Sequence, residues 1–370
     1  MIMAAFSEIN LLLIPVILGF GVSVCVTPLV IKFGKKLHLE DNPVLNKHPK
    51  NTHTYPVPRG GGVPIFAALI IGVYLLLPID KHLIGVIVGA GVVLIIGLID
   101  DYKNLSPYWR LLCNLLAALL VVGAGIGIAY LTNPFGSGII DLSQPQINFN
   151  LFGELRSIWI IADVFAIVWI MALMNIVGQG AGGIDGQYPG VIAIAAITIG
   201  LLSLNFSADI TQWPVIILAG ITAGAYLGFL PWNFYPQRIM PGYSGKSLGG
   251  FLLAVLAILS TTKVGTALVV LGVPIMDASW SIVRRIMQKK SPVWGDRGHL
   301  HHKLLDLGWG KRKVAAFYWI VTAVLGLIAL QLNSQQKFYT IIGIGVIIGA
   351  ILVWLNWQLI SSKLLDQDNG

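Results

Sequence analysis

Apolar runs long enough to cross a lipid bilayer constrain the fold of this chain more than any other feature. A hydrocarbon core about 30 Å thick requires roughly 20 apolar residues per helix. Several of the runs are rich in glycine, which suits close packing of helices in lipid. The runs lie near residues 9–31, 62–79, 83–100, 110–131, 157–176, 189–205, 213–230, 247–262, 265–283, 314–332 and 338–360. We therefore expect residues 1–370 to form one all-α polytopic membrane domain, a bundle of about 11 transmembrane helices.

The composition supports this interpretation and excludes a soluble globular domain. Hydrophobic residues make up 56% of the chain and charged residues 11%, whereas a soluble domain carries about 25% charged residues. The net charge of +8 resides mainly in short segments between the apolar runs. Anionic lipid headgroups, phosphorylated substrates and membrane topology explain such a distribution better than nucleic acid does.

The distribution of lysine and arginine predicts the orientation of the helices. If the N-terminus lies outside and the connecting segments alternate, 20 of the 24 lysines and arginines fall on the same side. Cytoplasmic loops carry such an excess of basic residues. We therefore expect the N-terminus outside and the polar, motif-bearing loops in the cytoplasm, with residues 132–156 forming a connection on the outer side.

Two adjacent carboxylates, Asp100 and Asp101, lie where the third apolar run meets the predicted cytoplasmic face. Carboxylates at a membrane edge are costly without a compensating cation. Hard oxygen ligands suit Mg²⁺, which commonly bridges to a substrate phosphate. The alternative is an ordinary acidic helix end. Lys103 and Arg110 follow, either as phosphate ligands or as anchors of the topology.

A glycine-rich segment follows the fifth apolar run, which Asn175 closes. Its glycines expose backbone amides, and Asp185 comes shortly after them. Backbone amides and one carboxylate can together hold the ribose or the base of a nucleotide. The alternative is a flexible turn in which Asp185 caps the next helix.

Two later segments add charges at the same predicted face. Arg238 and Lys246 could contact phosphate or anchor their loop in the cytoplasm. Asp277 lies inside the ninth predicted span, where an ionisable group implies function or pairing. Arg284, seven residues later and on the same helix face, is its candidate partner.

Three of the seven histidines, His299, His301 and His302, occupy four positions of a polar segment. Their spacing does not suit zinc, because no two are four residues apart and no cysteine assists. Beside Arg297 and Lys303 they would suit a diphosphate, and the alternative is a histidine-rich surface loop. Carboxylates, a glycine loop, histidines and bases on one membrane face are together suited to Mg²⁺-assisted transfer of a phosphoryl group to a lipid phosphate.

These segments resemble, in order and over nearly the whole chain, the polyprenyl-phosphate N-acetylhexosamine-1-phosphate transferases, glycosyltransferase family 4. They look closer to the undecaprenyl-phosphate N-acetylglucosamine-1-phosphate transferase branch than to the phospho-N-acetylmuramoyl-pentapeptide transferases. The histidine segment is the most specific. The matching segments are PVPRGGGVPI (56–65), GLIDDYKNLSP (97–107), Asn175 with GGIDG (182–186), PWNFYPQRI (231–239), VPIMDASWSIVRR (273–285) and DRGHLHHKLLDLG (296–308).

The resemblance implies a bundle of ten or eleven helices in the bacterial cytoplasmic membrane, with a cytoplasmic active site. It implies transfer of N-acetylhexosamine-1-phosphate, expected to be GlcNAc-1-phosphate, from a UDP-sugar to undecaprenyl phosphate with release of UMP. This reaction initiates cell-envelope glycan synthesis. The implied cofactor is Mg²⁺. The implied partners are undecaprenyl phosphate, the UDP-sugar, the lipid bilayer and a second copy of the chain, without nucleic acid.

The family's functional positions can be carried over to this chain. Asp100 and Asp101 match the aspartate pair that acts in catalysis and binds the metal. The positions expected to bind substrate are Asn175, Asp185, Asn233, His299, His301, His302, Arg297, Lys103 and Arg110.

Two departures from the family pattern lie in the expected site. Gln179 and Gly182 replace an Asn and an Asp of the family's N-x-x-D-G-x-D-G loop. The family's G-D-x-G-S reads here Gly-Tyr-Ser-Gly-Lys, so that Tyr243 replaces an Asp that binds Mg²⁺ and Lys246 replaces the Ser. A phenol with a pKa of about 10 is a poor ligand for Mg²⁺.

Three alternatives follow from these departures. The enzyme is active with the metal held by Asp100, Asp101 and substrate phosphate; or Lys246 partly replaces the charge of the metal; or the chain is a degenerate member that binds lipid phosphate or UDP-sugar without turnover. A transporter would instead favour charges or broken helices near the middle of the bilayer. Nearly all acids lie at the cytoplasmic ends, and Asp163, toward the outside of its span, is the main exception. We expect Asp163 to make a local hydrogen bond or to face a polar crevice.

Overall fold

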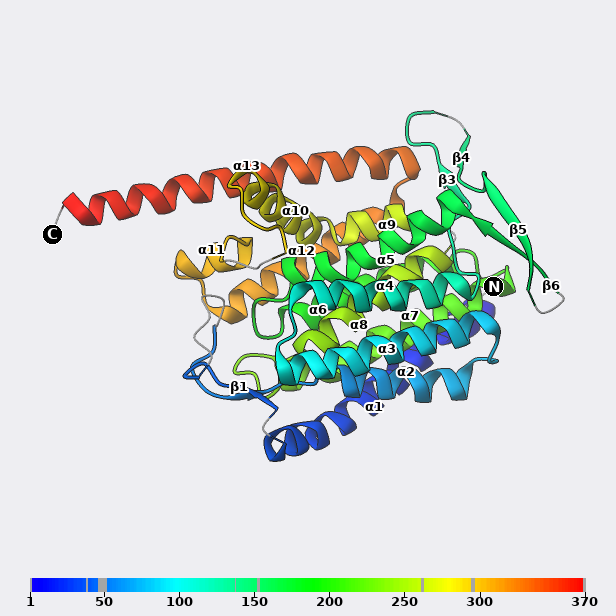
Figure 1. Ribbon diagram of the computed structural model, residues 1–370, viewed down its shortest axis with the longest axis horizontal. Helices are drawn as coiled ribbons and strands as arrows, with labels where there is room; N and C mark the ends of the chain where they lie inside the picture. Colours follow the sequence, from blue (N-terminus) through cyan, green and yellow to red (C-terminus); the bar gives the residue numbers. More distant parts are fainter. Residues whose placement is uncertain are drawn as a thin grey trace.

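The computed structural model describes residues 2–37, 39–45, 52–136, 138–151, 154–260, 263–293 and 297–368, which form mainly helices packed side by side (Figure 1). A short 3₁₀ turn, Ile210–Gln212, precedes α7. The helices are α1 (Ile2–Lys36), α2 (Gly62–Leu76), α3 (Lys81–Lys103), α4 (Pro107–Gly123), α5 (Ile160–Gly180), α6 (Gln187–Leu204), α7 (Trp213–Asn233), α8 (Gly242–Leu259), α9 (Lys263–Val270), α10 (Gly272–Met287), α11 (Leu300–Asp306), α12 (Lys311–Gln331) and α13 (Ser334–Asp368).

Each of the predicted apolar runs coincides with a helix or, in one case, with a pair of helices. Within the described residues, 8 helices are long and apolar enough to cross a membrane, or up to 9 if the bent pair α9–α10 is one span. The helices α2 and α4 are apolar but shorter. The chain is therefore a multi-pass membrane protein.

The predicted span over 265–283 is not one continuous helix. The two helices α9 and α10 meet at 82°. Pro274 lies in the first turn of α10 and has no N–H to donate back to α9, so a continuous helix would lose a hydrogen bond there. Gly272 adds to the break because it lets α13 approach: a Cβ at Gly272 would lie 2.9 Å from Ile344 Cδ1.

The predicted fourth span, 110–131, is also too long. The helix α4 ends at Gly123, and Gly125 has a φ of 95°, which side-chain-bearing residues rarely adopt. The chain leaves the helix at these glycines and enters a strand. Apolar composition alone therefore extended this span beyond its true end.

Six short strands show that the all-α prediction is wrong in detail. They form three antiparallel pairs, β1–β2, β3–β4 and β5–β6. In β5 the apolar residues Ile147 and Phe149 alternate with asparagines, which is the period of a strand. The strands are β1 (Glu40–Asp41), β2 (Val57–Pro58), β3 (Tyr130–Thr132), β4 (Ile139–Asp141), β5 (Gln146–Leu151) and β6 (Glu154–Trp159).

The centre of the bundle consists of α6, α7 and α8, the most buried of the long helices. Glycines at a spacing of four residues on α7, Gly220, Gly224 and Gly228, face the backbone of α1. A Cβ at Gly220 would lie 2.7 Å from Leu12 O, so only glycine permits this approach. Small residues at such spacing are typical of close helix packing in membranes.

The two ends of the bundle differ (Figure 1). Strands β3–β6 and the N-terminus lie at one end, which we call the strand end, and β1 and α11 lie at the other, which we call the motif end. The prediction for Asp163 is confirmed at the strand end, because Trp159 N donates to Asp163 Oδ2 over 3.0 Å. The helix α13 extends past the motif end.

Candidate functional site

The carboxylate pair is buried where α3 ends. Asp100 is 3% exposed and Asp101 5%. Asp100 Oδ1 accepts hydrogen bonds from Arg110 Nε over 2.6 Å and from Leu105 N over 3.0 Å. No described residue donates to Asp100 Oδ2. The pair is therefore more than an ordinary acidic helix end, and Arg110 supplies the cation that buried charge requires.

Asp101 holds the beginning of α8 against the end of α3. Its Oδ1 accepts from Tyr243 N over 2.6 Å, and its Oδ2 accepts from Ser244 Oγ over 2.6 Å and from Ser244 N over 3.4 Å. Exposed N–H groups at a helix N-terminus attract negative charge. Asp101 therefore acts as a cap supplied from another helix.

Tyr243 lies between the two carboxylates and α4. Its hydroxyl donates to Asn114 Oδ1 over 3.2 Å. The guanidinium of Arg110 lies 5.0 Å from the centre of the Tyr243 ring, within the range of a cation–π contact. The tyrosine thus packs under the cation that pairs with Asp100.

Arg59 joins β2 to the carboxylate pair, a role that the sequence did not indicate. Its guanidinium forms an ion pair with Asp41 over 2.8 Å and donates to Asn104 Oδ1 over 2.6 Å and to Asp101 O over 3.3 Å. Arg59 lies within PVPRGGGVPI, so the family resemblance marked the segment but not the residue. The one sequence feature that could have indicated a role for Arg59 was its position inside this motif.

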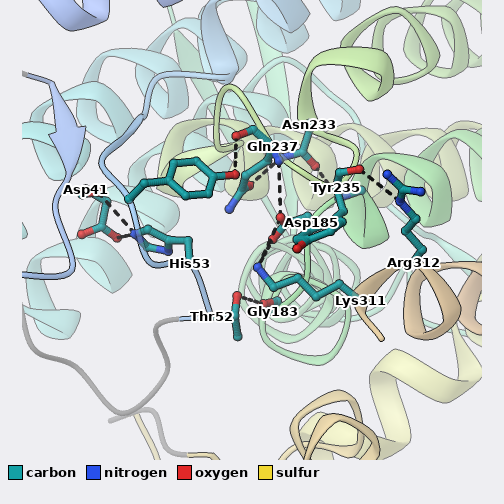
Figure 2. Close-up of polar contacts among 12 residues, drawn as sticks. Asp41, Thr52, His53, Gly183, Asp185, Asn233, Tyr235, Gln237, Lys311 and Arg312 are labelled. Atoms are coloured by element: carbon teal, nitrogen blue, oxygen red, sulfur yellow. Dashed lines mark hydrogen bonds and ion pairs between the residues drawn. The ribbon is translucent and has the colours of Figure 1, made fainter. Parts of the chain in front are cut away.

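The glycine-rich loop after α5 brings Asp185 to the N-terminus of α12 (Figure 2). The Asp185 side chain has no exposed surface, and its two oxygens lie 3.3 and 3.4 Å from Lys311 Nζ. Gln237 N donates to Asp185 Oδ2 over 3.4 Å. The residue at the N-cap of α6 is Gly186, without a side-chain cap, so the interpretation of Asp185 as a helix cap is wrong.

Asn233 ties the end of α7 to this loop (Figure 2). It accepts from Gly186 N over 3.0 Å and donates to Gln237 Oε1 over 3.0 Å and to Ile239 O over 2.8 Å. Tyr55 OH donates to Gln237 O over 3.0 Å. Burial, with the charge of Asp185 and then Tyr235, raises the pKa of Tyr55. The oxygen and the nitrogen of the Asn233 side-chain amide therefore both hold the loop in place.

An aromatic pocket of about 350 Å³ lies beside Asp185. Lys311 Nζ lies 5.0 Å from the centre of the Tyr235 ring, and Arg312 Nε donates to Tyr235 O over 3.3 Å. Flat aromatic walls with cations at the rim suit a planar or anionic ligand. The pocket is lined by Pro231, Trp232, Phe234, Tyr235, Pro236 and Arg238.

His299 has both ring nitrogens engaged. Asp277 Oδ2 lies 3.0 Å from its Nδ1, and Arg285 Nη2 lies 3.4 Å from its Nε2. Because arginine only donates hydrogen bonds, Nε2 is the acceptor and Nδ1–H points to Asp277. Leu300 N donates to Asp277 Oδ1 over 2.8 Å. The expected partnership of Asp277 with Arg284 is therefore wrong, and Asp277 instead anchors the start of α11.

The histidines are not a surface loop, because His299, His301 and His302 are 4%, 1% and 2% exposed. The rings of His299 and His301 stack at 5.5 Å, and His301 packs against Gly183, where any Cβ would collide with the imidazole. Burial lowers the pKa of His301 well below its ordinary value, and the nearby His302, His299 and Lys246 lower it further. The neutral form of His301 is therefore favoured at neutral pH.

Lys246 connects the carboxylate, glycine and histidine segments. It lies on α8 one turn after the residues that hold Asp101, and its side chain runs along the glycine loop. A Cβ at Gly182 would lie 2.9 Å from Lys246 Cε, and one at Gly178 would lie 3.4 Å from Lys246 Cβ. The three segments that the sequence singled out therefore meet at the motif end.

Three other expected substrate ligands lie on α5, at the end of α3 and just before α11. Asn175 Nδ2 donates to Met171 O of its own helix over 2.7 Å. Lys103 is exposed at the end of α3. Arg297 pairs with Asp306 over 2.6 Å, with both side chains 40% exposed. Exposed pairs of this kind contribute little to stability.

The residues that the sequence left unassigned complete the buried ion pairs. Lys311 belongs to a basic run at the start of α12, and topology alone explained that run. Arg285 donates to Pro292 O over 2.9 Å and to Gln179 Oε1 over 3.5 Å, besides its contact with His299. Arg285 is only 2% exposed, which distinguishes it from a surface base that only sets the membrane topology.

Fold and site together define a class: a multi-pass membrane protein with paired buried charges and an aromatic pocket at one end of its bundle. The model of glycosyl transferase family 4 matches residues 83–261, from α3 to the end of α8. This range includes Asp100, Asp101 and Asp185. The match confirms the resemblance to this family that was seen in the sequence.

Three relatives show the breadth of the likeness. A probable undecaprenyl-phosphate N-acetylglucosaminyl 1-phosphate transferase of Bacillus subtilis is 25% identical, over 91% of this chain and 90% of the relative. A decaprenyl-phosphate N-acetylglucosaminephosphotransferase of Mycobacterium tuberculosis is 29% identical, over 82% and 78%. A phospho-N-acetylmuramoyl-pentapeptide-transferase of Bacillus velezensis is 27% identical, over 86% and 97%.

Proposed function

We propose that the protein transfers GlcNAc-1-phosphate from UDP-GlcNAc to undecaprenyl phosphate, releases UMP and so initiates cell-envelope glycan synthesis. The names of its relatives support the type of reaction, the lipid acceptor and the N-acetylglucosamine group. One structural observation carries the proposal: the aspartate pair, the Asp185 loop and the histidine segment meet at one end of a membrane-embedded bundle.

The proposal includes the orientation of the chain. The whole chain acts as one domain with eleven spans in the bacterial cytoplasmic membrane, with the N-terminus outside and the motif end in the cytoplasm. The excess of basic residues at the motif end supports this orientation. A fluorescent protein fused to the C-terminus should then fluoresce, because it would fold in the cytoplasm. A homodimer, which the family likeness implies, is part of the proposal, and light scattering in detergent measures it.

The reaction requires one bond to form and one to break. An oxygen of the lipid phosphate attacks the phosphorus that carries the sugar, and the bond from that phosphorus to the bridging oxygen breaks. UMP leaves with the electron pair of that bond. Positioning and charge neutralisation supply most of the catalysis in such transfers.

Asp100 is the carboxylate suited to orient the lipid phosphate or to accept its proton. Its Oδ1 is fixed by Arg110 and Leu105 N, which aims the other oxygen. Asp101 has both oxygens bound to α8, so its part is to hold α8 and α3 together. We assign the nucleotide to the Asp185 loop and the adjacent aromatic pocket.

Mg²⁺ enters the proposal as the ion that neutralises the diphosphate. Among the described residues, no group of three or more His, Cys, Asp or Glu is placed to hold a metal. Mg²⁺ is often held by one or two carboxylates together with substrate phosphates and water. Asp100, with Asp101 beside it, fits such a shared site. Tyr243 adds no anionic ligand, because its hydroxyl donates to Asn114.

Binding of the same substrates without turnover is a second candidate. Tyr243 and Lys246, in the first turns of α8, favour it because they make this part of the site more positive than the family pattern does. It predicts binding of UDP-GlcNAc or lipid phosphate without UMP.

The test is UMP release by the purified protein with undecaprenyl phosphate and UDP-GlcNAc, in Mg²⁺ or EDTA. We expect lipid-dependent and Mg²⁺-dependent UMP, and its loss in Asp100→Asn. The variant Tyr243→Asp runs in parallel. Silence in the wild type with activity in Tyr243→Asp would establish the second candidate. Silence in both would count against the proposed substrates.

A further inference from the structure

The turn that follows α3 is held by Arg59, the residue directly after β2. We propose that Arg59 is a positioning residue for the proposed reaction: anchored on Asp41, it fixes this turn and thereby aims the Asp100 carboxylate at the acceptor phosphate. The inference rests on the proposed function, because Asp100 is assigned to the lipid phosphate there. It deepens that function by naming the residues that orient Asp100.

The turn and the Asp100 carboxylate are coupled by two hydrogen bonds. Asn104 N donates to Asp100 O over 2.7 Å, and Leu105 N donates to Asp100 Oδ1 over 3.0 Å. Asn104 closes α3 with a φ of 51°, in the left-handed region that residues other than glycine adopt infrequently. The direction of the Asp100 carboxylate therefore depends on where this turn is held.

Arg59 holds the turn from outside the helix. Its Nη1 donates to Asn104 Oδ1 over 2.6 Å and to Asp101 O over 3.3 Å. Asp101 O lies in the last turn of α3, where carbonyls lack an N–H partner within the helix, and basic side chains commonly supply one. Arg59 thus acts as a C-terminal cap for α3 that comes from a segment 42 positions before Asp101.

Arg59 is itself held by the β1 segment. Its Nη2 lies 2.8 Å from Asp41 Oδ2, and the side chains of Arg59 and Asp41 are 18% and 9% exposed. Arg59 N also donates to Leu39 O over 2.9 Å, which extends the antiparallel pairing of β1 with β2. The backbone and the side chain of Arg59 are therefore both tied to the same segment.

These contacts favour positioning over direct binding of a substrate. Both terminal nitrogens of the Arg59 guanidinium contact acceptors of the protein. The planar guanidinium delivers its donors in fixed directions, whereas a lysine ammonium is a point charge on a flexible stem. A misplacement of about 1 Å can lower a rate about 100-fold. A small movement of the turn should therefore slow the reaction without removing a contact to the donor nucleotide.

The first measurement is steady-state UMP release by the purified full-length protein with undecaprenyl phosphate and UDP-GlcNAc in Mg²⁺. Arg59→Met should lower kcat about 10- to 100-fold, while KM for UDP-GlcNAc stays within about threefold of the wild type. Arg59→Lys should recover kcat only in part, because it keeps the charge but not the planar group. Asp41→Asn should lower kcat less, and it should add no further fall to Arg59→Met because the two residues act together.

Lys36→Met is the matched control. Lys36 is exposed at the end of α1, close to β2, since a Cβ at Gly34 would lie 3.3 Å from Pro58 Cβ. The variant removes a neighbouring positive charge and leaves the turn after α3 untouched. Its kcat and KM should equal those of the wild type.

Amide hydrogen exchange gives a second readout that does not require turnover. The amides of Asn104 and Leu105 should exchange about 10-fold faster in Arg59→Met, because the turn loses its hydrogen bonds to a charged group. Exchange at the start of α3 should not change. Asp41→Asn, which keeps Arg59, carries the same test if Arg59→Met does not fold.

Four results would overturn the inference. Unchanged exchange in Arg59→Met would show that Arg59 does not hold the turn. Faster exchange with unchanged kcat would show that the turn does not direct Asp100. Full recovery of kcat by Arg59→Lys would show that only the charge matters. A rise in KM for either substrate with unchanged kcat would show that Arg59 binds substrate directly.

The two readouts separate this inference from the proposed function. Faster exchange in Arg59→Met with no UMP release by the wild type would keep Arg59 as the residue that holds the turn and reject the transferase. Lipid-dependent UMP release by the wild type, with unchanged exchange and kcat in Arg59→Met, would keep the transferase and reject the role of Arg59.

Discussion

Charged side chains have different kinds of partner at the motif end and at the strand end of the bundle. At the motif end, buried carboxylates pair with basic side chains or with helix amides, some of them from distant parts of the chain. At the strand end, the described charges make local or single contacts, such as Asp163 with Trp159 N and Lys337 with Thr266 over 2.9 Å. The pairs of the motif end are Asp41–Arg59, Asp100–Arg110, Asp185–Lys311 and Asp277–His299.

This difference indicates which end of the bundle carries the functional site. Taking a charge out of water is costly, and a partner repays that cost only with good geometry. A fold that needed stability alone would place apolar residues at such positions. The concentration of pairs at one end indicates that the charges serve a ligand, and removing single partners at each end tests that comparison.

The largest effect is expected for Asp277→Ala. It removes a carboxylate without exposed surface that orients His299 and begins α11. Breaking a buried pair costs about 3–5 kcal/mol, and denaturant unfolding in detergent measures it. The matched change at the strand end, Asp163→Ala, removes a local capping bond and should cost about 1 kcal/mol. Equal losses of stability in the two variants would contradict the proposed difference between the motif end and the strand end.

A smaller loss is expected for Lys311→Met. It leaves the buried Asp185 without its cation and should cost about 2–3 kcal/mol of stability. The affinity for UDP should fall as well, because the nucleotide loop loses its anchor on α12. Lys311→Arg should recover most of both. Stable protein with unchanged affinity for UDP would remove Asp185 from the nucleotide site.

The pH dependence of stability should carry the signature of His301. Its folded pKa lies well below its ordinary value, so the unfolded chain binds the proton more readily. The stabilisation is therefore complete above the ordinary histidine pKa of about 6.5 and declines as the pH falls toward the folded pKa, by at most about 1.4 kcal/mol per pH unit. Unfolding of the wild type and of His301→Gln between pH 7.5 and about pH 5 compares the slopes. Identical slopes would mean that folding does not shift the pKa of His301.

Tyr243→Phe should have a modest effect. It removes the hydroxyl that donates to Asn114 but keeps the ring under Arg110. The loss of one hydrogen bond costs about 0.5–1.5 kcal/mol, and UMP release should stay within about twofold. A much larger fall in UMP release, with normal folding, would mean that the phenol takes part in the reaction.

Lys337→Met at the strand end should have the smallest effect. The variant loses one hydrogen bond to Thr266 and also the cost of burying an ammonium group. These terms oppose each other, so stability should change by less than about 1 kcal/mol. UMP release and UDP affinity should equal those of the wild type, and a change in either would couple the two ends.

The sequence predicted the helices better than their details. Long apolar runs located the helices because hydrophobicity over about 20 residues is a local property. The break before α10 and the early end of α4 depend on single prolines and glycines, whose effect is decided by the neighbours that approach them. The strands after α4 were missed because a composition of Gly, Pro, Ser and Asn favours a loop.

The candidate site shows the same division. Its aspartates and histidines were identified from their residue types in polar segments between apolar runs. Their partners were not, since Asp185 meets Lys311 across 126 positions and Tyr243 meets Asp101 across 142. The burial of the histidines was also missed, because polar residues between spans are expected to face water.

The amino-acid sequence by itself therefore determined that this chain crosses a membrane many times, which residue types it collects between spans, and which family it resembles. Only the tertiary structure decided that Asp277 orients His299, that Asp101 caps α8, and that Lys246 lies along the glycine loop. Apolar length and residue chemistry are carried by short segments. Pairing of charges across more than 100 positions exists only after the helices pack, because packing sets which helix ends meet.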